Sequence, residues 1–285
     1  MLAAERRRVF ADWRALILAR RVALSLNHPL PKKERLRKLL TELAQQAHAE
    51  TVSSVRGVYQ INAPYAELLP VAEEHVVAEA NPLAVLSHQT ALAYHGLTND
   101  IPKRLYATHY GATRDGRRPL GTTPEDWVEL SAPRLTMPKL IGNVPIIWSR
   151  TQSQWDFGHE IGFVHGVPVY LTDLERTLVD SIRSPEACGG LSSVFRAWHQ
   201  ATECWNLDRL ISYVERFDIG ILRQRAGFLI ESLGSTHVKL DQWQSGGIRG
   251  GSAKLSAADP FTSRHSERWN LSLNVPDEVL AELQG

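Results

Sequence analysis

Two helical patterns followed directly by a β-rich segment fill the first 61 residues, and this order limits the fold more than any other feature. Apolar residues fall near helical spacing from about Ala3 to Leu26, and Asn27-His28-Pro29 ends the pattern. Leucines at i, i+3, i+4 and i+7 predict a second, amphipathic helix over about 32–46, with Pro31 at a favoured first position. Residues 50–61 are rich in β-branched and aromatic side chains, which predicts a short β-hairpin. This order is typical of a winged helix-turn-helix, although the short middle helix expected near 22–31 has no pattern of its own.

The same segment carries most of the chain's positive charge. Residues 1–62 hold twelve Lys and Arg against five Asp and Glu, a net charge of +7, whereas the whole chain sums to +1. The remainder is therefore mildly acidic. Six arginines are expected on the outer face of the first helix: Arg6, Arg7, Arg8, Arg14, Arg20 and Arg21. Such a division predicts that the N-terminal part meets a polyanion.

The second helix offers side chains of the types that contact DNA. Arg bridges guanine and Gln bridges adenine in the major groove, while Lys and Thr bind phosphates. The alternative interpretation is a solvated helix face, and the basic bias together with the following hairpin favours DNA. The candidate DNA-binding residues are Lys33, Arg35, Arg37, Lys38, Thr41, Gln45 and, at the hairpin tip, Arg56.

A length of 285 residues favours two domains. We expect a winged-helix domain with its connecting helix over 1–80, ending before Asn81-Pro82, and a larger mixed α/β domain over 81–285, so the fold class is mixed α+β. Strands are predicted at 105–108, 127–130, 144–148, 161–165 and 167–171, with strand-like pieces over 238–274. Helices are predicted at 87–95, 174–183, 190–205, 207–217 and 219–233.

The most patterned segment of the chain is 171–180. Thr172 and Glu175 have the spacing of a capping box, and Arg176 and Asp180 can pair along a helix. A catalytic role would need a further group that the spacing does not identify, so a structural role is favoured.

The sequence contains no pattern of an enzyme or metal protein that we could identify. Cys188 and Cys204 lack the companions of a zinc site, the Gly246–Gly251 loop lacks the order of a phosphate-binding loop, and no GxSxG occurs. No apolar run reaches the roughly 18 residues needed to span a bilayer. We therefore expect no catalytic residues, cofactor, metal or membrane contact, and a cytoplasmic location.

Several of these segments together resemble the AbiEi family, the antitoxin and transcriptional-repressor half of a bacterial toxin–antitoxin pair linked to phage defence. The matches are Arg-Gly-Val-Tyr at 56–59, the segments 91–97, 103–107 and 169–180, then Pro185 and the pair Gly189-Gly190. Two departures are a longer opening helix and a longer stretch between Tyr106 and Val164.

The resemblance implies an N-terminal domain that binds double-stranded operator DNA and represses its own operon, and a C-terminal domain that counters a nucleotidyltransferase-like toxin without requiring tight contact. The family-motif residues Thr172, Glu175, Arg176, Asp180, Gly189 and Gly190 would then serve packing or antitoxin action. Two alternatives stay open. One is a metal-dependent DNA nuclease that uses Asp173, Glu175 or Asp180. The other is a ligand-sensing regulator that has no toxin.

Overall fold

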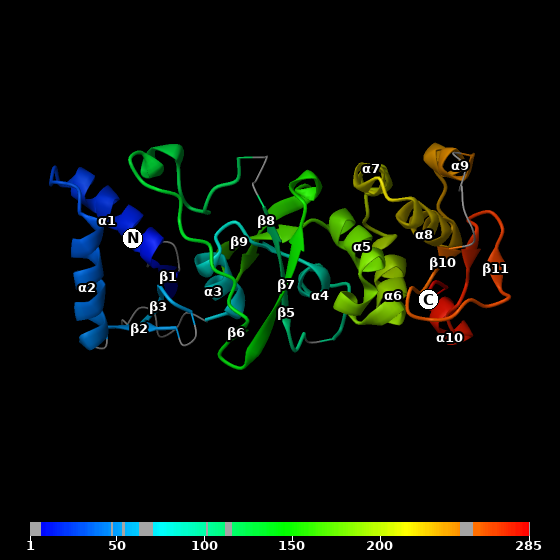
Figure 1. Cartoon of the computed structure of the whole chain (residues 1–285), viewed down its shortest axis with the longest axis horizontal. Helices are drawn as coiled ribbons and strands as arrows, with labels where there is room; N and C mark the ends of the chain where they lie inside the picture. Colours follow the sequence, from blue (N-terminus) through cyan, green and yellow to red (C-terminus); the bar gives the residue numbers. More distant parts are fainter. Residues whose placement is uncertain are drawn as a thin grey trace. The chain divides into compact units, whose positions relative to one another are not determined.

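A computed structural model describes residues 7–46, 48–52, 55–62, 71–100, 102–111, 116–245 and 253–284, apart from the side chains of Lys33, Arg37, Ala44 and Ser245. The fold is mixed α+β, with three separate sheets among these residues (Figure 1). Among the helices of the described residues, none is long and apolar enough to cross a membrane.

The chain forms two compact units. The first contains residues 1–86, 103–156 and 160–171, and the second contains residues 87–102, 157–159 and 172–285. The first 80 residues thus share a unit with the strands that follow them, so the compact units do not coincide with the predicted domain boundary at residues 80 and 81.

The first unit begins with a small antiparallel sheet and two helices. Its elements are β1 (Val9–Ala11), α1 (Asp12–Ser25), α2 (Lys33–Gln45), β2 (Ala49–Thr51) and β3 (Val58–Ile61). The strand order is β1-β3-β2, with Val9 opposite Gln60 and Ala49 opposite Ile61. The hairpin predicted over 50–61 is confirmed.

Two predictions for this segment are wrong. Residues 9–11 form a strand and not the start of a long helix, because all three are buried and pair with β3. Residues 26 and 27 form a turn and residues 28–32 an irregular segment, so there is no middle helix. Residues 3–6 of the predicted helix lie outside the described residues.

A six-stranded sheet, in the order β6-β7-β5-β4-β9-β8, follows. Its strands are β4 (Val85–Leu86), β5 (Leu105–Tyr110), β6 (Leu140–Ile141), β7 (Val144–Thr151), β8 (His159–Val164) and β9 (Val167–Thr172). Helix α3 (Glu73–Ala80) and the sheet share one core, to which Val77, Ala107 and Leu171 contribute. The part of the predicted connecting helix before residue 71 lies outside the described residues. The strand predicted at 127–130 is wrong, because Pro124–Trp127 form a 3-10 turn, η2, which Pro124 and the cap at Thr123 favour. A second 3-10 turn, η3, covers Ser153–Trp155.

The second unit is mainly helical. It contains α4 (His88–Tyr94), α5 (Leu174–Arg183), η4 (Pro185–Cys188), α6 (Gly190–Ala201), α7 (Leu207–Phe217), α8 (Gly220–Ser232), α9 (Val238–Ser245) and α10 (Asp277–Ala281). The short strands β10 (Ala253–Lys254), β11 (His265–Ser266) and β12 (Leu271–Ser272) form its sheet. The predicted helices over 87–95, 174–183, 207–217 and 219–233 are confirmed within two residues, and the helix predicted over 190–205 ends at Ala201. The strand-like prediction from residue 238 is wrong for 238–245, which form α9, and α10 was not predicted.

Candidate nucleic-acid interface

Helix α2 has two opposite faces of different chemistry. Leu36 and Leu40 are buried and pack in a cluster with Phe10, Leu16 and Ile61. At about 100° per residue, Arg35, Lys38, Thr41 and Gln45 fall within about 120° of one another, centred opposite the two buried leucines. All four are exposed. The side of α2 that faces away from its own core therefore presents two cations, a hydroxyl and an amide, together with the exposed carboxylates of Glu34 and Glu42.

Fewer leucines of α2 are buried than the spacing of the four leucines predicted. Leu39 is 47% exposed and Leu43 is 39% exposed, so only two of the four leucines reach the core. This differs from the prediction because α1 and β2 are the elements that pack most closely against α2, and they leave Leu39 and Leu43 partly in solvent.

Of the seven predicted DNA-binding residues, five can be placed. Arg35, Lys38, Thr41 and Gln45 lie on the exposed face of α2, and Arg56 is exposed in the turn between β2 and β3. The side chains of Lys33 and Arg37 lie outside the described residues. Strand β2 follows α2 directly and packs against it, so the helix and the hairpin belong to one small substructure.

The arginines that were expected on the outer face of α1 are largely used inside the first unit, which corrects that prediction. Arg7 and Arg14 are almost fully buried and donate to one carboxylate oxygen of Glu79 at 3.0 and 2.7 Å. The other oxygen accepts the backbone N–H of Ala11 at 2.9 Å. Burial of charge is costly unless it is paired and hydrogen-bonded, and here both guanidinium groups share the Glu79 carboxylate.

Two further arginines of α1 bind the segment around η2. Arg21 donates to both oxygens of Asp126, at 2.8 and 2.5 Å, and these hydrogen bonds hold the pKa of Asp126 below its usual range. Arg20 donates to the backbone carbonyl of Val128. The cations of the N-terminal segment therefore fall into two groups. Those on and just before α1 mostly bind partners within the first unit, whereas those on α2 and in the hairpin turn are exposed.

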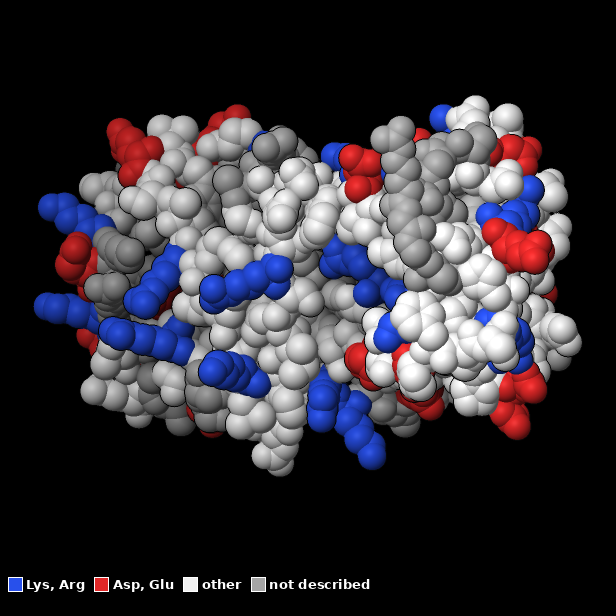
Figure 2. Space-filling view, turned by 45° about the vertical axis from the view of Figure 1, so that its right-hand side comes forward, with Lys and Arg blue, Asp and Glu red and all other residues white. Residues whose placement is uncertain are grey.

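The surface of the chain carries charges of both signs. Figure 2 shows Lys and Arg side chains spaced across the face that it presents, with Asp and Glu side chains at the edges of that view and also beside cations near its middle. Among the exposed side chains of α2 itself, the cations Arg35 and Lys38 are accompanied by Glu34 and Glu42. The face of α2 is thus mixed and suited to selective contacts, whereas a purely cationic face would bind any polyanion.

The family-motif segment forms the end of β9 and the whole of α5. Asp173, and not Thr172, caps the helix by accepting the backbone N–H of Arg176 at 2.8 Å. The predicted capping box is therefore wrong by one residue, because Thr172 still belongs to the strand and its hydroxyl bonds to Thr177. Glu175 instead accepts the backbone N–H of Asn206 at 2.7 Å and pairs with Arg209.

Arg176 lies at the centre of the second unit's core. Its Nε donates to Asp180 at 2.9 Å and its Nη1 donates to the carbonyl of Phe157 at 2.7 Å. The guanidinium lies over the rings of Phe157 and Phe217, at 4.5 and 4.6 Å. Burial alone would raise the pKa of Asp180, but the charge of Arg176 holds it below its ordinary value. The predicted pair of Arg176 and Asp180 is confirmed, and it is an interior pair.

The remaining motif residues shape the turn after α5. Gly189 and Gly190 both have positive φ, +85° and +86°, and join η4 to α6. At Gly189 an added Cβ would lie 2.9 Å from the hydroxyl oxygen of Ser193, which explains why a glycine fits there. Cys188 is fully buried, and burial raises the pKa of its thiol. These residues shape the interior of the unit.

Sequence analysis missed several residues of this architecture. Glu79 is the only carboxylate among the buried residues of α3, which also include His75 and three apolar residues, and such a carboxylate was a signal of an internal ion pair. Asp173 directly precedes a helical pattern and has the side chain that N-caps prefer, so it was also recognisable. Tyr213, whose hydroxyl donates to Asp173 at 2.6 Å, gave no signal. Within the part of the chain that the structure describes, no three His, Cys, Asp or Glu side chains gather as a metal site would require.

Comparison with known proteins bears on the fold of the chain and not on its function. No protein-family model matches the sequence, and no curated protein matches it. Among solved structures, the chain is similar to the RV2827C protein from Mycobacterium tuberculosis, with a TM-score of 0.52 and 13% sequence identity over 99% of this chain and 90% of that one. At this identity the likeness concerns the fold alone.

Proposed function

We propose that this chain is a DNA-binding transcriptional repressor of its own operon, acting in the cytoplasm as the antitoxin of a bacterial toxin–antitoxin pair. The observation that carries the DNA-binding part is the exposed face of α2. Arg35, Lys38, Thr41 and Gln45 line one side of a helix whose other side is held by Leu36 and Leu40.

The dimensions of the helix suit the major groove. An α-helix with its side chains is about 10–12 Å across, and the major groove of B-DNA is about 12 Å wide. An arginine on such a helix can bridge the two acceptors of guanine, and a glutamine can pair with the donor and acceptor of adenine. Lys38 and Thr41 lie between them and are placed for phosphate contacts.

The hairpin supports the same proposal. Strands β2 and β3 follow α2 directly, and their turn carries the exposed Arg56. A hairpin that follows the recognition helix is the wing of a winged helix-turn-helix, and a cation at its tip can bind a phosphate or enter the minor groove. Accordingly we assign residues 1–80 to DNA binding, with the recognition helix at α2.

The antitoxin part of the proposal rests on the resemblance to the AbiEi family. Under it, residues 81–285 counter a nucleotidyltransferase-like toxin. Glu175 and Asp180 are held by Arg209 and Arg176, so we give them a structural role and not a metal-binding one. The outer surface of the second unit, and not its motif core, would then act on the toxin or its target.

The test of DNA binding is an electrophoretic shift assay across a salt series, with the protein's own upstream DNA and a random duplex. We expect tighter binding to the upstream fragment. Replacement of Lys38 and Gln45 together should weaken that binding at least tenfold, because a phosphate contact and a base contact are both lost. The matched control is Arg104→Gln, which removes an exposed charge of the same unit outside α2 and the hairpin. Equal affinity of the double variant and the control would refute the assignment of α2.

Substitution is a sharper test than truncation. Glu79 is the common partner of Arg7 and Arg14, so a chain that begins at residue 81 loses three buried charged residues and part of the core of the first unit. Loss of DNA binding in that truncation would not separate contact from folding, whereas α2 substitutions alter only exposed side chains.

The antitoxin role needs a separate experiment. Co-expression with a nucleotidyltransferase-like protein encoded beside this gene should restore growth, and the Lys38 and Gln45 double variant should restore it equally well. Growth that stays arrested with wild-type protein contradicts the antitoxin role and leaves the DNA-binding assignment standing.

A further inference from the structure

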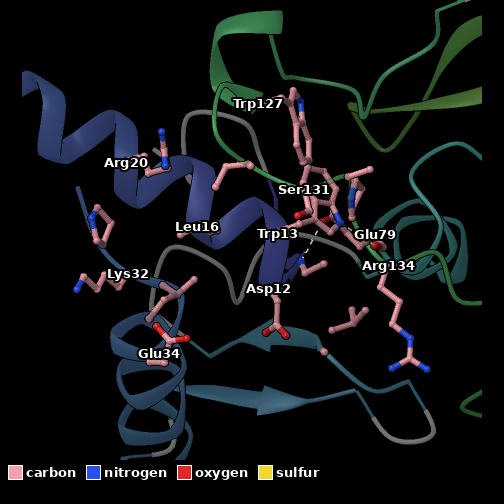
Figure 3. A pocket seen from close by; sticks show the side chains of 18 of the residues that line it. Asp12, Trp13, Leu16, Arg20, Lys32, Glu34, Glu79, Trp127, Ser131 and Arg134 are labelled. Atoms are coloured by element: carbon pink, nitrogen blue, oxygen red, sulfur yellow. Dashed lines mark hydrogen bonds between the residues drawn. The ribbon is translucent and has the colours of Figure 1, made fainter.

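The first unit contains a cavity of about 700 Å³ beside the elements that we assign to DNA binding (Figure 3). Its walls come from α1, the beginning of α2, the turn between β2 and β3, the end of α3 and the segment 127–136. Small-molecule sites in proteins have volumes of roughly 300–1,000 Å³. The cavity therefore has the size of a ligand site, and it draws on segments far apart in the sequence.

One wall is aromatic. The rings of Trp13 and Trp127 lie 6.0 Å apart between centroids, and neither indole N–H is left for a ligand. Trp13 donates to the carbonyl of Glu79 at 3.0 Å, and Trp127 donates to the hydroxyl of Thr122 at 3.0 Å. What the two tryptophans can offer to the cavity is ring surface, and Leu16 adds an apolar side chain to the lining. This lining suits a planar apolar body.

Asp12 brings a carboxylate without a complete set of partners into this lining. It is the first residue of α1, and Figure 3 shows its side chain projecting from the helix towards the strands of the hairpin. Its Oδ1 is shielded from solvent and has no hydrogen-bond partner among the described residues. A buried acceptor without a donor costs about 1–3 kcal/mol, more when it is charged. A ligand with an N–H group would remove that cost.

Charges of both signs surround the opening. Lys32, Arg56 and Arg134 are exposed, and the described residues make no ion pair with them. Glu34 and Glu129 are also exposed members of the lining. In the view of Figure 3, Lys32 and Glu34 lie on one side of Asp12 and Arg134 on the other. With Asp12 and Glu79 the lining holds four carboxylates, and with Arg20 it holds four cations, which suits neither a simple anion nor a simple cation.

We propose that this cavity binds a small aromatic molecule that carries both N–H donors and an anionic group. Its ring would lie against Trp13 and Trp127, its N–H group would reach Asp12, and its anionic group would meet Arg56, Lys32 or Arg134. Mononucleotides and aromatic amino acids share this chemistry. Because Lys32, Leu36 and Arg56 line the cavity, the ligand also changes the position of α2 and the hairpin turn, and hence the affinity for DNA. That regulatory half rests on the proposed function, whereas the binding half does not.

The binding half is tested by isothermal titration of the full chain with GMP and with L-tryptophan, and with ribose 5-phosphate as an anion without a ring. We expect GMP or L-tryptophan to bind with a Kd below about 1 mM, and ribose 5-phosphate not to bind. Binding of GMP alone identifies the nucleotide class, and binding of L-tryptophan alone identifies the amino-acid class. Absence of binding by both overturns the proposal.

Variants locate the bound molecule. Asp12→Asn and Trp127→Ala should each weaken binding at least tenfold, and Arg134→Gln, an exposed change that leaves the core intact, at least threefold. Arg104→Gln serves as the matched control and should bind as the wild type does. Thermal unfolding of every variant shows whether it is folded. Unchanged affinity in folded Trp127→Ala and Arg134→Gln protein places the ligand elsewhere and overturns the assignment.

The regulatory half is tested by repeating the shift assay with the ligand present at saturation. We expect at least a fivefold change in affinity for the upstream fragment, and by reciprocity an equal change in ligand affinity when DNA is present. Ligand binding with unaltered DNA affinity removes the regulatory half and keeps the site. A protein that binds the ligand but never binds DNA refutes the proposed function and not the cavity assignment.

Discussion

Helices α2 and α5 both carry charged residues at helical spacing, yet the structure gives those charges opposite surroundings. In α5, eight of ten residues are buried, and they include Arg176 and Asp180. In α2, Leu36 and Leu40 are buried, while Arg35 and Lys38 are exposed. The same residue types therefore hold a core together in one helix and face solvent in the other. What separates the cases is how many neighbouring elements cover the helix.

The difference has an energetic basis. A guanidinium leaves water only where its hydrogen bonds and charge are matched, and Arg176 has Asp180, the carbonyl of Phe157 and two aromatic rings. Helix α5 packs against α4, α6, α7 and α8. Because α2 has one covered side, its charged residues keep their hydration and stay available for a partner outside the chain.

The largest expected effect comes from removing Arg176, the buried cation of α5. Arg176→Ala leaves Asp180 and the Phe157 carbonyl without their donor in a closed core, and should lower the free energy of unfolding by about 3–5 kcal/mol. Arg35→Ala in α2 should change it by less than about 0.5 kcal/mol. Urea denaturation followed by circular dichroism measures both. Similar losses in the two variants would contradict the contrast between the helices.

A second effect tests how closely the backbone approaches Arg176. Gly158 has φ +67°, and an added Cβ would lie 2.8 Å from the Cβ of Arg176. Gly158→Ala should therefore cost more than the strain of positive φ alone, which is about 1 kcal/mol or somewhat more. Gly96 is the matched control in the same unit, with φ +70° and open space around it. Denaturation midpoints that fall equally in Gly158→Ala and Gly96→Ala would show that the close approach contributes nothing.

The contrast also explains which elements the sequence could predict. Helix α7 was predicted with its observed bounds, since Leu210, Ile211, Val214 and Phe217 form a buried face by helical spacing alone. The strands predicted at 161–165 and 167–171 correspond to β8 and β9, and the turn between them uses positive φ at His165 and Gly166. These elements depend on local patterns. By contrast, β1 was predicted as helix because only its pairing with β3, some fifty residues later, makes it a strand.

The candidate site was predictable on its exposed side and not on its buried side. The polar face of α2 follows from helical geometry, so its residues could be named in advance. The burial of Arg7 and Arg14 could not, because their partner Glu79 is more than sixty residues away. The cavity is lined by residues from Ala11 to Thr136, and no local pattern predicts such a convergence.

A third expected effect is on DNA binding, and it tests whether the exposed polar residues of α2 contact a partner, unlike the buried ones of α5. Gln45→Ala should lower the preference for one base pair of the operator by about 1–3 kcal/mol, because a base contact is lost. Lys38→Gln should weaken binding to every sequence and lower the salt slope by about one unit. Neither should change stability noticeably. Competition with operators mutated at single positions measures the first change, and a salt titration of the shift assay measures the second.

The identity of the recognition helix depends on the difference between those two variants. If Gln45→Ala and Lys38→Gln reduce binding to operator and random DNA by the same factor, α2 does not contact bases in the assumed orientation. A chain variant with Arg104→Gln, altered outside α2, controls for the loss of one positive charge.

The smallest expected effect is a pH dependence that belongs to the second unit's core. Burial lowers the pKa of His88, although Asp180 opposes this and Arg183 and Arg176 add to it. Because the folded pKa of His88 lies below its ordinary value of 6.5, the unfolded chain binds the extra proton first as the pH falls. The free energy of unfolding should therefore decrease from about pH 6.5 downwards, by at most about 1.4 kcal/mol per pH unit for this one proton. Asp180, whose pKa is held below 3.8, adds a further loss only below that pH.

His88→Asn isolates this contribution, because asparagine tolerates the positive φ of +53° at this position and carries no titrating proton. His75 and His109 in the first unit also have pKa values lowered by burial, so the wild-type curve alone cannot assign the slope. The informative quantity is the difference in unfolding free energy between wild type and His88→Asn, measured by urea denaturation at pH 7.5, 6.5, 6.0 and 5.5. That difference should shrink as the pH falls, since only the wild type must exclude a proton from the core beside Arg176. Parallel curves would mean that His88 is protonated as easily in the folded core as in the unfolded chain, and the contrast between a closed α5 and an open α2 would then lack its electrostatic consequence.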